Sequence, residues 1–350
     1  MTSLTAYIIR RLILLVLVIL GVTVLIFAIT MMFPPEIRAY MYIRNAEQAR
    51  PGVIEQVILI HGLNDPFYVQ YGRWMSQVFQ GNLGWSYTST QTVVAAISGR
   101  WVFTFEIVMF AAPIIIFVGI YLGVQSAIHR NGLIDHICRL ASIIGWSLPS
   151  FWLGLILISV FSGQLHWVTI GPLSSGYIDF IADGISSHTW TAYTGIHVFD
   201  GLLNLHPEIT LDAIKHCILP VCVIVAIDVA LLIRVMRSSM LEALNKAYII
   251  TAKAKGLSKN VVIYKHARRN ALIPVATLSG MLVAGLLGGL VITETVFAFG
   301  GLGSWAARAA LSTDIPAVLG YAILSAVIFV ISNLIVDILY AYIDPRIRLE

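Results

Sequence analysis

The sequence predicts an all-α membrane protein with six transmembrane helices, and two observations lead to this fold class. Of its 350 residues, 58% are hydrophobic and only 11% are charged, whereas soluble chains carry about 25% charged residues. Six stretches are also apolar over roughly the 20 residues that a spanning helix needs. They cover residues 12–33, 102–127, 139–163, 217–236, 271–294 and 316–340. The length suits one polytopic membrane domain.

The first apolar stretch begins after an arginine pair, residues 10–11, and stops at a proline pair, residues 34–35, where a helix cannot continue. Its apolar core is longer than the roughly 7–15 residues of a secretory signal, and no small-residue cleavage site follows. We therefore expect a retained helix. The fourth stretch is the weakest candidate, because its apolar part is short and contains Asp228.

The basic residues predict the orientation of the chain. Residues 1–11, 128–139, 234–272 and 341–350 together hold 15 of the 22 Lys and Arg residues. Because basic loops stay on the cytoplasmic side, we expect both termini in the cytoplasm of a multi-pass protein of the cell membrane.

Two long segments are then extracellular and divide the chain into regions. Residues 1–33 form the tail and first helix, residues 34–101 an extracellular segment, and residues 102–350 the core domain. Within the core, residues 164–215 carry a net charge of −4 and many turn-forming residues, which predicts an irregular outer lobe with short helices. A cytoplasmic loop spans residues 237–272.

Several kinds of chemistry are disfavoured by the motifs. There is no G-x-x-x-x-G-K-[ST] motif, so the chain itself is not expected to bind a nucleotide. Serines beside glycines lack a histidine that could activate them as nucleophiles, and the histidines form no HxH or HxxxH pair for a metal. The positive charge is concentrated in loops, so it indicates topology and no nucleic-acid binding.

Three acidic residues in or near the apolar stretches are candidates for lining a translocation path. Asp228 lies in the middle of the fourth stretch, while Glu106 and Glu294 lie near the outer ends of the second and fifth. Charged side chains are costly in hydrocarbon and normally face a bundle interior or a water-filled path. The alternative is an ion pair or helix cap at a packed interface.

The basic loop has the largest excess of positive charge in the chain. Residues 234–272 contain nine Lys and Arg residues and one acid, Glu242. Apolar or small residues recur with helical spacing from Met240 to Lys255, at positions 241, 244, 248 and 252. Gly256 then suits the left-handed position that ends a helix.

A second short helix is expected from Ser258, as its N-cap, to about Arg268. Two amphipathic helices joined at Gly256 could rest one face on the membrane bundle and offer the other to a groove in a partner. A loop that binds anionic lipid, or one that only sets the topology, would have the same composition.

The loop also resembles a known motif. The run Tyr248-Ile-x-Thr-Ala-Lys-Ala-Lys-Gly-Leu-Ser258, followed by Val262-Ile-x-Lys-His-Ala-x-Arg-Asn-Ala-Leu-Ile-Pro274, resembles the EAA loop of ABC-importer permeases of the dipeptide/oligopeptide type. Other motifs along the chain resemble the first of the two sibling permeases of that family. They include Leu63-Asn-Asp-Pro66, Ser147-Leu-Pro-Ser-Phe-Trp152, Glu294-Thr-Val-Phe297, Gly301-Leu-Gly303 and Asp344-Pro-Arg-Ile347.

This resemblance implies the type I ABC importer permease fold and an alternating-access mechanism. It implies no cofactor in this chain, since ATP and Mg would be bound by two separate ABC ATPase subunits. The other implied partners are a sibling permease in a heterodimer, an extracellular solute-binding protein and the lipid bilayer. The residues expected to couple to the ATPase are Ala252, Ala254, Lys255, Gly256, Leu257, Ser258, Val262, His266, Arg269 and Asn270.

The substrate stays open at this point. Members of this branch carry peptides, nickel or oligosaccharides, and peptide transport and sugar transport are equally compatible with the sequence. Two functions of other classes also remain. An ion-coupled transporter or channel would use Asp228, Glu106 and Glu294 without ATPases, and a lipid-binding scaffold would use the basic loop.

Overall fold

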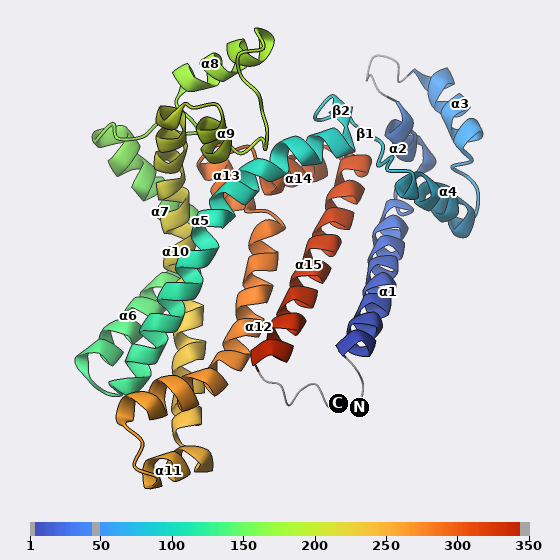
Figure 1. Ribbon diagram of the computed structural model, residues 1–350. Coiled ribbons are helices and arrows are strands. Elements are labelled where there is room, and N and C mark those ends of the chain that lie inside the picture. The colour runs from blue at the N-terminus through green and yellow to red at the C-terminus, as the bar shows by residue number, and fades with distance from the viewer. Residues whose placement is uncertain (1–3, 44–49, 344–350) are drawn as a thin grey trace.

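The computed structural model describes residues 4–43 and 50–343, so the expectations for residues 344–350 lie outside it. Nearly all regular structure is helical (Figure 1). The elements are α1 (Leu4–Thr30), α2 (Pro35–Ala39), the 3₁₀ helix η1 (Tyr40–Tyr42), α3 (Pro51–His61), α4 (Phe67–Phe79), β1 (Trp85–Ser86), β2 (Gln91–Thr92), α5 (Val93–Ile128), α6 (Leu133–Ser147), α7 (Ser150–Leu157), the π-helix η3 (Ile158–Gln164), α8 (Ser175–Ser186), α9 (His197–Leu203), α10 (Pro207–Leu244), α11 (Ala247–Ala254), the π-helix η4 (Val261–Ala267), α12 (Arg268–Leu287), α13 (Val291–Val296), α14 (Leu302–Leu311) and α15 (Ile315–Ile343).

The predicted all-α membrane fold is confirmed. Within the described residues, four helical segments are long and apolar enough to cross a membrane: α5, α10, residues 261–296 and α15. Two bent helix pairs raise the number to six if each pair counts as one span. The pairs are residues 16–30 with 35–42, bent by 119°, and residues 133–147 with 150–164, bent by 96°.

The third span therefore differs from the straight helix expected at residues 139–163. It bends at Leu148, whose backbone is extended (φ −80°, ψ 126°). Pro149 follows, and the residue before a proline is driven out of the α region by steric conflict with the proline ring. Helix α6 ends there and α7 begins in a new direction.

Other helix ends also differ from the expected boundaries. Helix α5 begins at Val93 instead of residue 102, because the Thr92 hydroxyl caps it by accepting a hydrogen bond from the amide of Ala95 (3.3 Å). Helix α10 begins at Pro207, before the apolar stretch expected from residue 217; proline suits the first turn because that turn leaves its amides unpaired. Helix α12 ends at Leu287, before Gly289 with φ +126°.

The core lies where α5 packs against α10. The packing is close because two glycines of α5 face large side chains of α10. A Cβ atom at Gly119 would lie 2.5 Å from Leu232, and one at Gly123 would lie 2.5 Å from Met236. Leu232 and Met236 are fully buried. Small residues allow helix backbones to approach in a membrane, where van der Waals contact drives association.

The elements outside the spans gather at two opposite ends. Helices α8 and α9 and the short β1–β2 hairpin lie at one end, while α11 lies at the other (Figure 1). The first residues of α1 and the last of α15 point toward the same end as α11. This arrangement separates the two lobes expected outside from the basic loop expected inside.

Candidate functional site

The basic loop forms a protruding unit of α11, a tight turn and η4 (Figure 1). Gly256 has φ +73°, and the two amides that close the turn donate to carbonyls of α11. The Gly256 amide donates to Lys253 (2.9 Å) and the Leu257 amide donates to Ala252 (3.3 Å). This pair of bonds is the Schellman motif, in which a left-handed residue ends the helix. The expected left-handed conformation of Gly256 is present.

The helices on both sides of the turn differ from the expectation. No continuous helix runs from Met240 to Lys255, because α10 ends at Leu244 and α11 begins at Ala247. The interruption shifts the buried face: Ile249 is fully buried, whereas Tyr248 is 39% exposed.

The expected second short helix is also different. Segment η4 passes directly into α12, so it is the first part of the fifth span. The residue at its N-cap is Asn260, which makes no side-chain cap. Ser258 instead accepts a hydrogen bond through its carbonyl from the Val262 amide (3.0 Å).

The residues expected to couple to a partner divide into two groups. Ala252 and Val262 are buried and pack on the core, and His266 is half-buried. The other members are exposed: five lie at the end of α11 and in the turn, and two lie at the start of α12; they are Ala254, Lys255, Gly256, Leu257 and Ser258, then Arg269 and Asn270. The Asn270 amide group donates to the His266 carbonyl of its own helix (3.1 Å). The unit thus has one face on the bundle and one face in solvent.

A buried ion pair fixes the helices above the loop. Asp135, at the start of α6, is fully buried and accepts two hydrogen bonds from the guanidinium of Arg237 on α10 (2.7 and 2.8 Å). It also accepts from the Ser126 hydroxyl of α5 (2.6 Å) and the Asn131 amide (3.0 Å). Such bidentate, charge-assisted pairs are short and directional. Three spans are therefore joined at the end of the molecule that carries the loop.

Two weaker contacts lie between these helices and the loop. The Gln125 amide group donates to the Tyr264 hydroxyl (3.4 Å), which links α5 to η4. Lys246 donates to Glu242 one turn earlier (2.8 Å), and this bond raises the pKa of the lysine. Because both side chains are more than half exposed, the pair contributes little to stability.

Asp228 lies in the middle of α10 and is half-buried. Among the described residues, its carboxylate forms no hydrogen bond or ion pair with a side chain or backbone group. A carboxylate without a protein partner in a spanning helix needs water or a partner chain beside it. Its position is compatible with the expected path.

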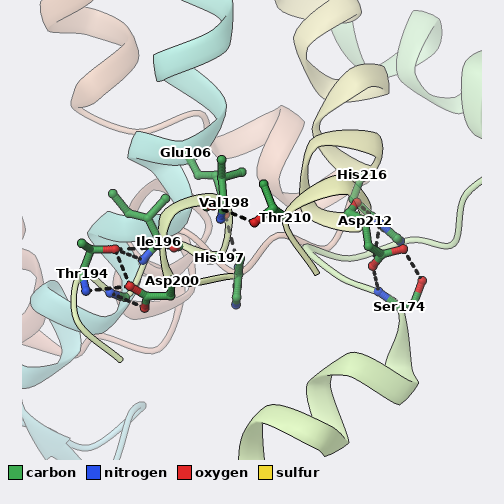
Figure 2. A network of polar contacts seen from close by, with 11 residues as sticks. Glu106, Ser174, Thr194, Ile196, His197, Val198, Asp200, Thr210, Asp212 and His216 are labelled. Carbon is green, nitrogen blue, oxygen red and sulfur yellow. Dashed lines mark hydrogen bonds and ion pairs between the residues drawn. The ribbon is translucent and has the colours of Figure 1, made fainter. Parts of the chain in front are cut away.

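Glu106 lies in a different setting, in the first half of α5 and against α9 (Figure 2). It is 1% exposed and accepts hydrogen bonds from the Val198 amide (2.9 Å) and the His197 imidazole (3.2 Å). Both residues belong to the first turn of α9, where a carboxylate satisfies the unpaired amides. This geometry is the helix cap that formed the alternative to a path residue.

Glu294 is also fully buried and saturated with hydrogen bonds. It accepts from the Thr104 hydroxyl (2.7 Å), the Leu290 amide (3.1 Å) and the Ser304 amide (2.7 Å). It thereby ties α5, α13 and α14 together. A Cβ atom at Gly301 would lie 2.6–2.7 Å from Thr104 and Glu294, which explains a glycine at this position. The carboxylate therefore holds these three elements together.

Three buried acids were missed by the sequence reasoning, which considered acids only inside the apolar stretches. Besides Asp135, the fully buried Asp314 accepts from the Ser86 hydroxyl (2.7 Å) and the Thr88 hydroxyl (2.6 Å), so it fastens the β1–β2 hairpin to the start of α15. Asp200 binds the turn before α9 (Figure 2). Their partners are set by tertiary contacts, and only the acid itself was visible in the sequence.

A metal centre is not indicated, since no group of three or more His, Cys, Asp and Glu side chains in the described part of the chain could hold an ion. The functional features of the described residues are thus a helical bundle with a buried polar framework at one end, the unpaired carboxylate of Asp228 and a basic loop exposed at the other end. These features define a multi-pass membrane protein with an exposed basic loop.

The chain belongs to the family described as binding-protein-dependent transport system inner membrane components, whose model matches residues 115–349. Residues 4–108 match the model of the N-terminal part of such membrane components. The chain is therefore the permease subunit of an ABC importer, a transport subunit of the type I permease fold. The ion-coupled transporter and the lipid scaffold find no support in this membership.

Curated relatives cover nearly the whole chain. It is 38% identical over 343 residues to the dipeptide transport system permease protein DppB of Alkalihalophilus pseudofirmus, covering 98% of this chain and 99% of the relative. It is 37% identical over 344 residues to the oligopeptide transport system permease protein AppB of Bacillus subtilis, with 98% and 99% covered. It is 38% identical to the di/tripeptide permease DppB of Pseudomonas aeruginosa over 344 residues, 98% of either chain.

Proposed function

We propose that this chain forms half of the translocation pathway of a peptide importer. The support is the agreement of its relatives, which are named as dipeptide, di/tripeptide and oligopeptide permeases and align over 98% of the chain. None of these names refers to a sugar or to nickel, so the oligosaccharide and nickel alternatives are set aside. The other half of the pathway is a sibling permease.

The exposed surface of α11, Gly256 and η4 is the contact with an ABC ATPase in this proposal. The observation that carries it is the geometry of the turn: a short helix ends in a Schellman motif, its inner face is buried, and the residues around Gly256 are exposed. An exposed short helix fits a groove in a partner. Two ATPase subunits would bind ATP and Mg, and this end of the molecule, with both termini, would face the cytoplasm.

At the opposite end, the segment of residues 34–101 and the lobe that follows the third span face outward and meet the extracellular binding protein. Closure of the ATPases then moves the loop, and the bundle alternates between inward-facing and outward-facing states. A ligand shifts such an equilibrium only through its different affinity for the two states. Asp228 lines the path in this mechanism, while Glu106 and Glu294 hold the outer framework that moves as one body.

The test replaces Gly256 with valine. A β-branched residue with φ near +73° costs about 1–2 kcal/mol of backbone strain, so the turn should open and lose its shape. We expect the complex to insert and assemble, but ATP hydrolysis should no longer depend on substrate-loaded binding protein, and peptide uptake should be lost. Uptake and hydrolysis are measured on the complete transporter in sealed vesicles.

Gly81 offers a matched control. It has φ +78° and open space around its Cβ position, as Gly256 has, but it lies after α4 in the outer segment. Gly81→Val therefore imposes the same local strain away from the loop. If both variants kept coupled hydrolysis, or if both lost it equally, the assignment of α11 and η4 to the ATPase contact would be wrong.

A further inference from the structure

Two arginines lie on neighbouring helices, Arg100 on α5 and Arg308 on α14. Both helices meet at the end of the bundle opposite α11 (Figure 1). Arg100 packs over the ring of Trp305, with its guanidinium carbon 5.9 Å from the ring centre. Arg308 is one turn after Trp305 on α14, is exposed, and is close enough to Arg100 for the two positive charges to repel each other. Like charges held together disfavour the folded state unless an anion lies between them.

No anion of the chain fills this role in the described residues. Neither arginine forms an ion pair there, and the buried Nε of Arg100 has no hydrogen-bond partner. Two buried acids of the same outer region are otherwise engaged. Glu294 is bonded to α5, α13 and α14, and Asp314 is bonded to the β1–β2 hairpin and to the Ala317 amide.

A hydroxyl completes the cluster. The Ser89 oxygen accepts hydrogen bonds from the Trp305 indole (2.7 Å) and from the Arg100 guanidinium (3.3 Å). A serine hydroxyl has two acceptor positions and one proton to donate. With both acceptor positions occupied, this group can only act as a donor toward a further ligand. The cluster therefore presents two guanidinium groups and one O–H, all of them donors.

We propose that Arg100, Arg308 and Ser89 form a carboxylate-binding site at the outer end of the permease that takes the C-terminal carboxylate of the transported peptide. Guanidinium forks match a carboxylate in geometry and charge. Every linear peptide with a free terminus carries this group whatever its side chains are, so a site for it suits an importer of varied peptides. Arg100 is half-buried against the buried Trp305, and Ser89, in the turn between β1 and β2, accepts a hydrogen bond from both side chains.

This inference rests on the proposed function, and it is tested by combining arginine substitutions with a change in the peptide. Uptake by the complete transporter in sealed vesicles is measured for a tripeptide with a free C-terminus and for the same tripeptide as its C-terminal amide. The binding protein is loaded equally with either peptide. Arg308→Gln and Arg100→Gln are compared with wild type. We expect each variant to slow uptake of the free acid about tenfold and uptake of the amide less than about twofold, since one charge-assisted contact is lost only with the acid.

Arg50→Gln is the control, because Arg50 is an exposed arginine of the same outer region whose side chain forms no hydrogen bond or ion pair among the described residues. Only its backbone carbonyl accepts hydrogen bonds, from the Val53 and Ile54 amides, and the substitution leaves these in place. It should slow neither peptide. If Arg100→Gln and Arg308→Gln slowed uptake of the free acid and of the amide equally, the carboxylate-binding site would be refuted. If excess binding protein restored the uptake rates of the variants for both peptides, the arginines would act in docking that protein and not in binding the carboxylate. If wild type were as slow as the variants in vesicles without anionic lipid, the arginines would bind a lipid headgroup instead.

The two proposals fail in different ways. If wild type imports neither peptide, peptide transport itself is wrong and the site falls with it. If wild type imports both and no variant distinguishes them, the carboxylate site alone is wrong. Assembly of each variant with its partner subunits, measured by size-exclusion chromatography, separates both results from misfolding.

Discussion

Asp135 illustrates at the scale of one residue how a charge can hold three spans together. Its carboxylate is fully buried and shared between Arg237 of α10 and Ser126 of α5. The desolvation cost of such a pair offsets much of its attraction, but removing one partner leaves the other charge buried and uncompensated. The residue is therefore more costly to change than any exposed ion pair in the chain's described part.

Asp135→Asn should lower the free energy of unfolding by about 3 kcal/mol, because Arg237 then lacks a counter-charge. Glu242→Gln breaks an exposed pair with Lys246 and should change it by less than about 1 kcal/mol. Denaturant titration of the purified chain in mild detergent measures both. A similar small loss for the two variants would show that Arg237 finds water or another acceptor.

At the scale of elements, the contact of α13 with α14 depends on two glycines. Gly289 and Gly303 approach so closely that a Cβ at Gly303 would lie 2.6 Å from the Val291 amide nitrogen. Glu294 and Ser304 are bonded across the same contact. The resemblance of Gly301-Leu-Gly303 to a family motif thus has a steric explanation: the glycines let two backbones meet.

Gly303→Ala should separate these two helices and destabilise the chain by about 1–3 kcal/mol, the usual cost of overpacking. Gly285→Ala on α12 is the matched control, since its Cβ would meet nothing within 4 Å. In a helix interior, that change should stabilise by about 0.5–1 kcal/mol. The thermal unfolding midpoints of the two variants should therefore move in opposite directions, and a downward shift in both would contradict the steric account.

At the scale of the whole molecule, the loop and the outer lobe lie at opposite ends, which allows the proposed orientation to be measured. Cys222 is exposed and is first replaced by serine, whereas Cys138 and Cys217 are buried. Single cysteines are then placed at the exposed Ser258 and Ser186. A membrane-impermeant maleimide added to intact cells should label Ser186→Cys, and Ser258→Cys only after the cells are opened.

The reverse labelling pattern would place the basic loop outside and exclude it as a contact for a cytoplasmic ATPase. Labelling of both positions in intact cells would mean that the two ends do not lie on opposite sides of the membrane. The expected pattern follows from the excess of Lys and Arg in residues 234–272.

Much of the fold was predictable because membrane spans are recognised by composition over a fixed length. Apolar stretches located the spans, and Gly256 was predicted to be left-handed because few other residues adopt that conformation. The bend at Leu148 had a local cause in Pro149 but was read as part of one helix, since proline is tolerated in spanning helices. The break between α10 and α11 has no comparable signal, because helical periodicity continues in the sequence across it.

The sequence by itself determined that the chain spans a membrane, which stretch forms its basic loop and which residue makes that loop turn. These properties depend on local composition and on the backbone preference of single residues. Only the tertiary structure decided which acids are bonded within the protein and which is unpaired. It also decided that Arg100 and Ser89 are bonded to each other next to α14, which carries Arg308. The partners of Glu106, Asp135 and Glu294 lie from 4 to 190 positions away, so the role of each charge depends on how the helices pack.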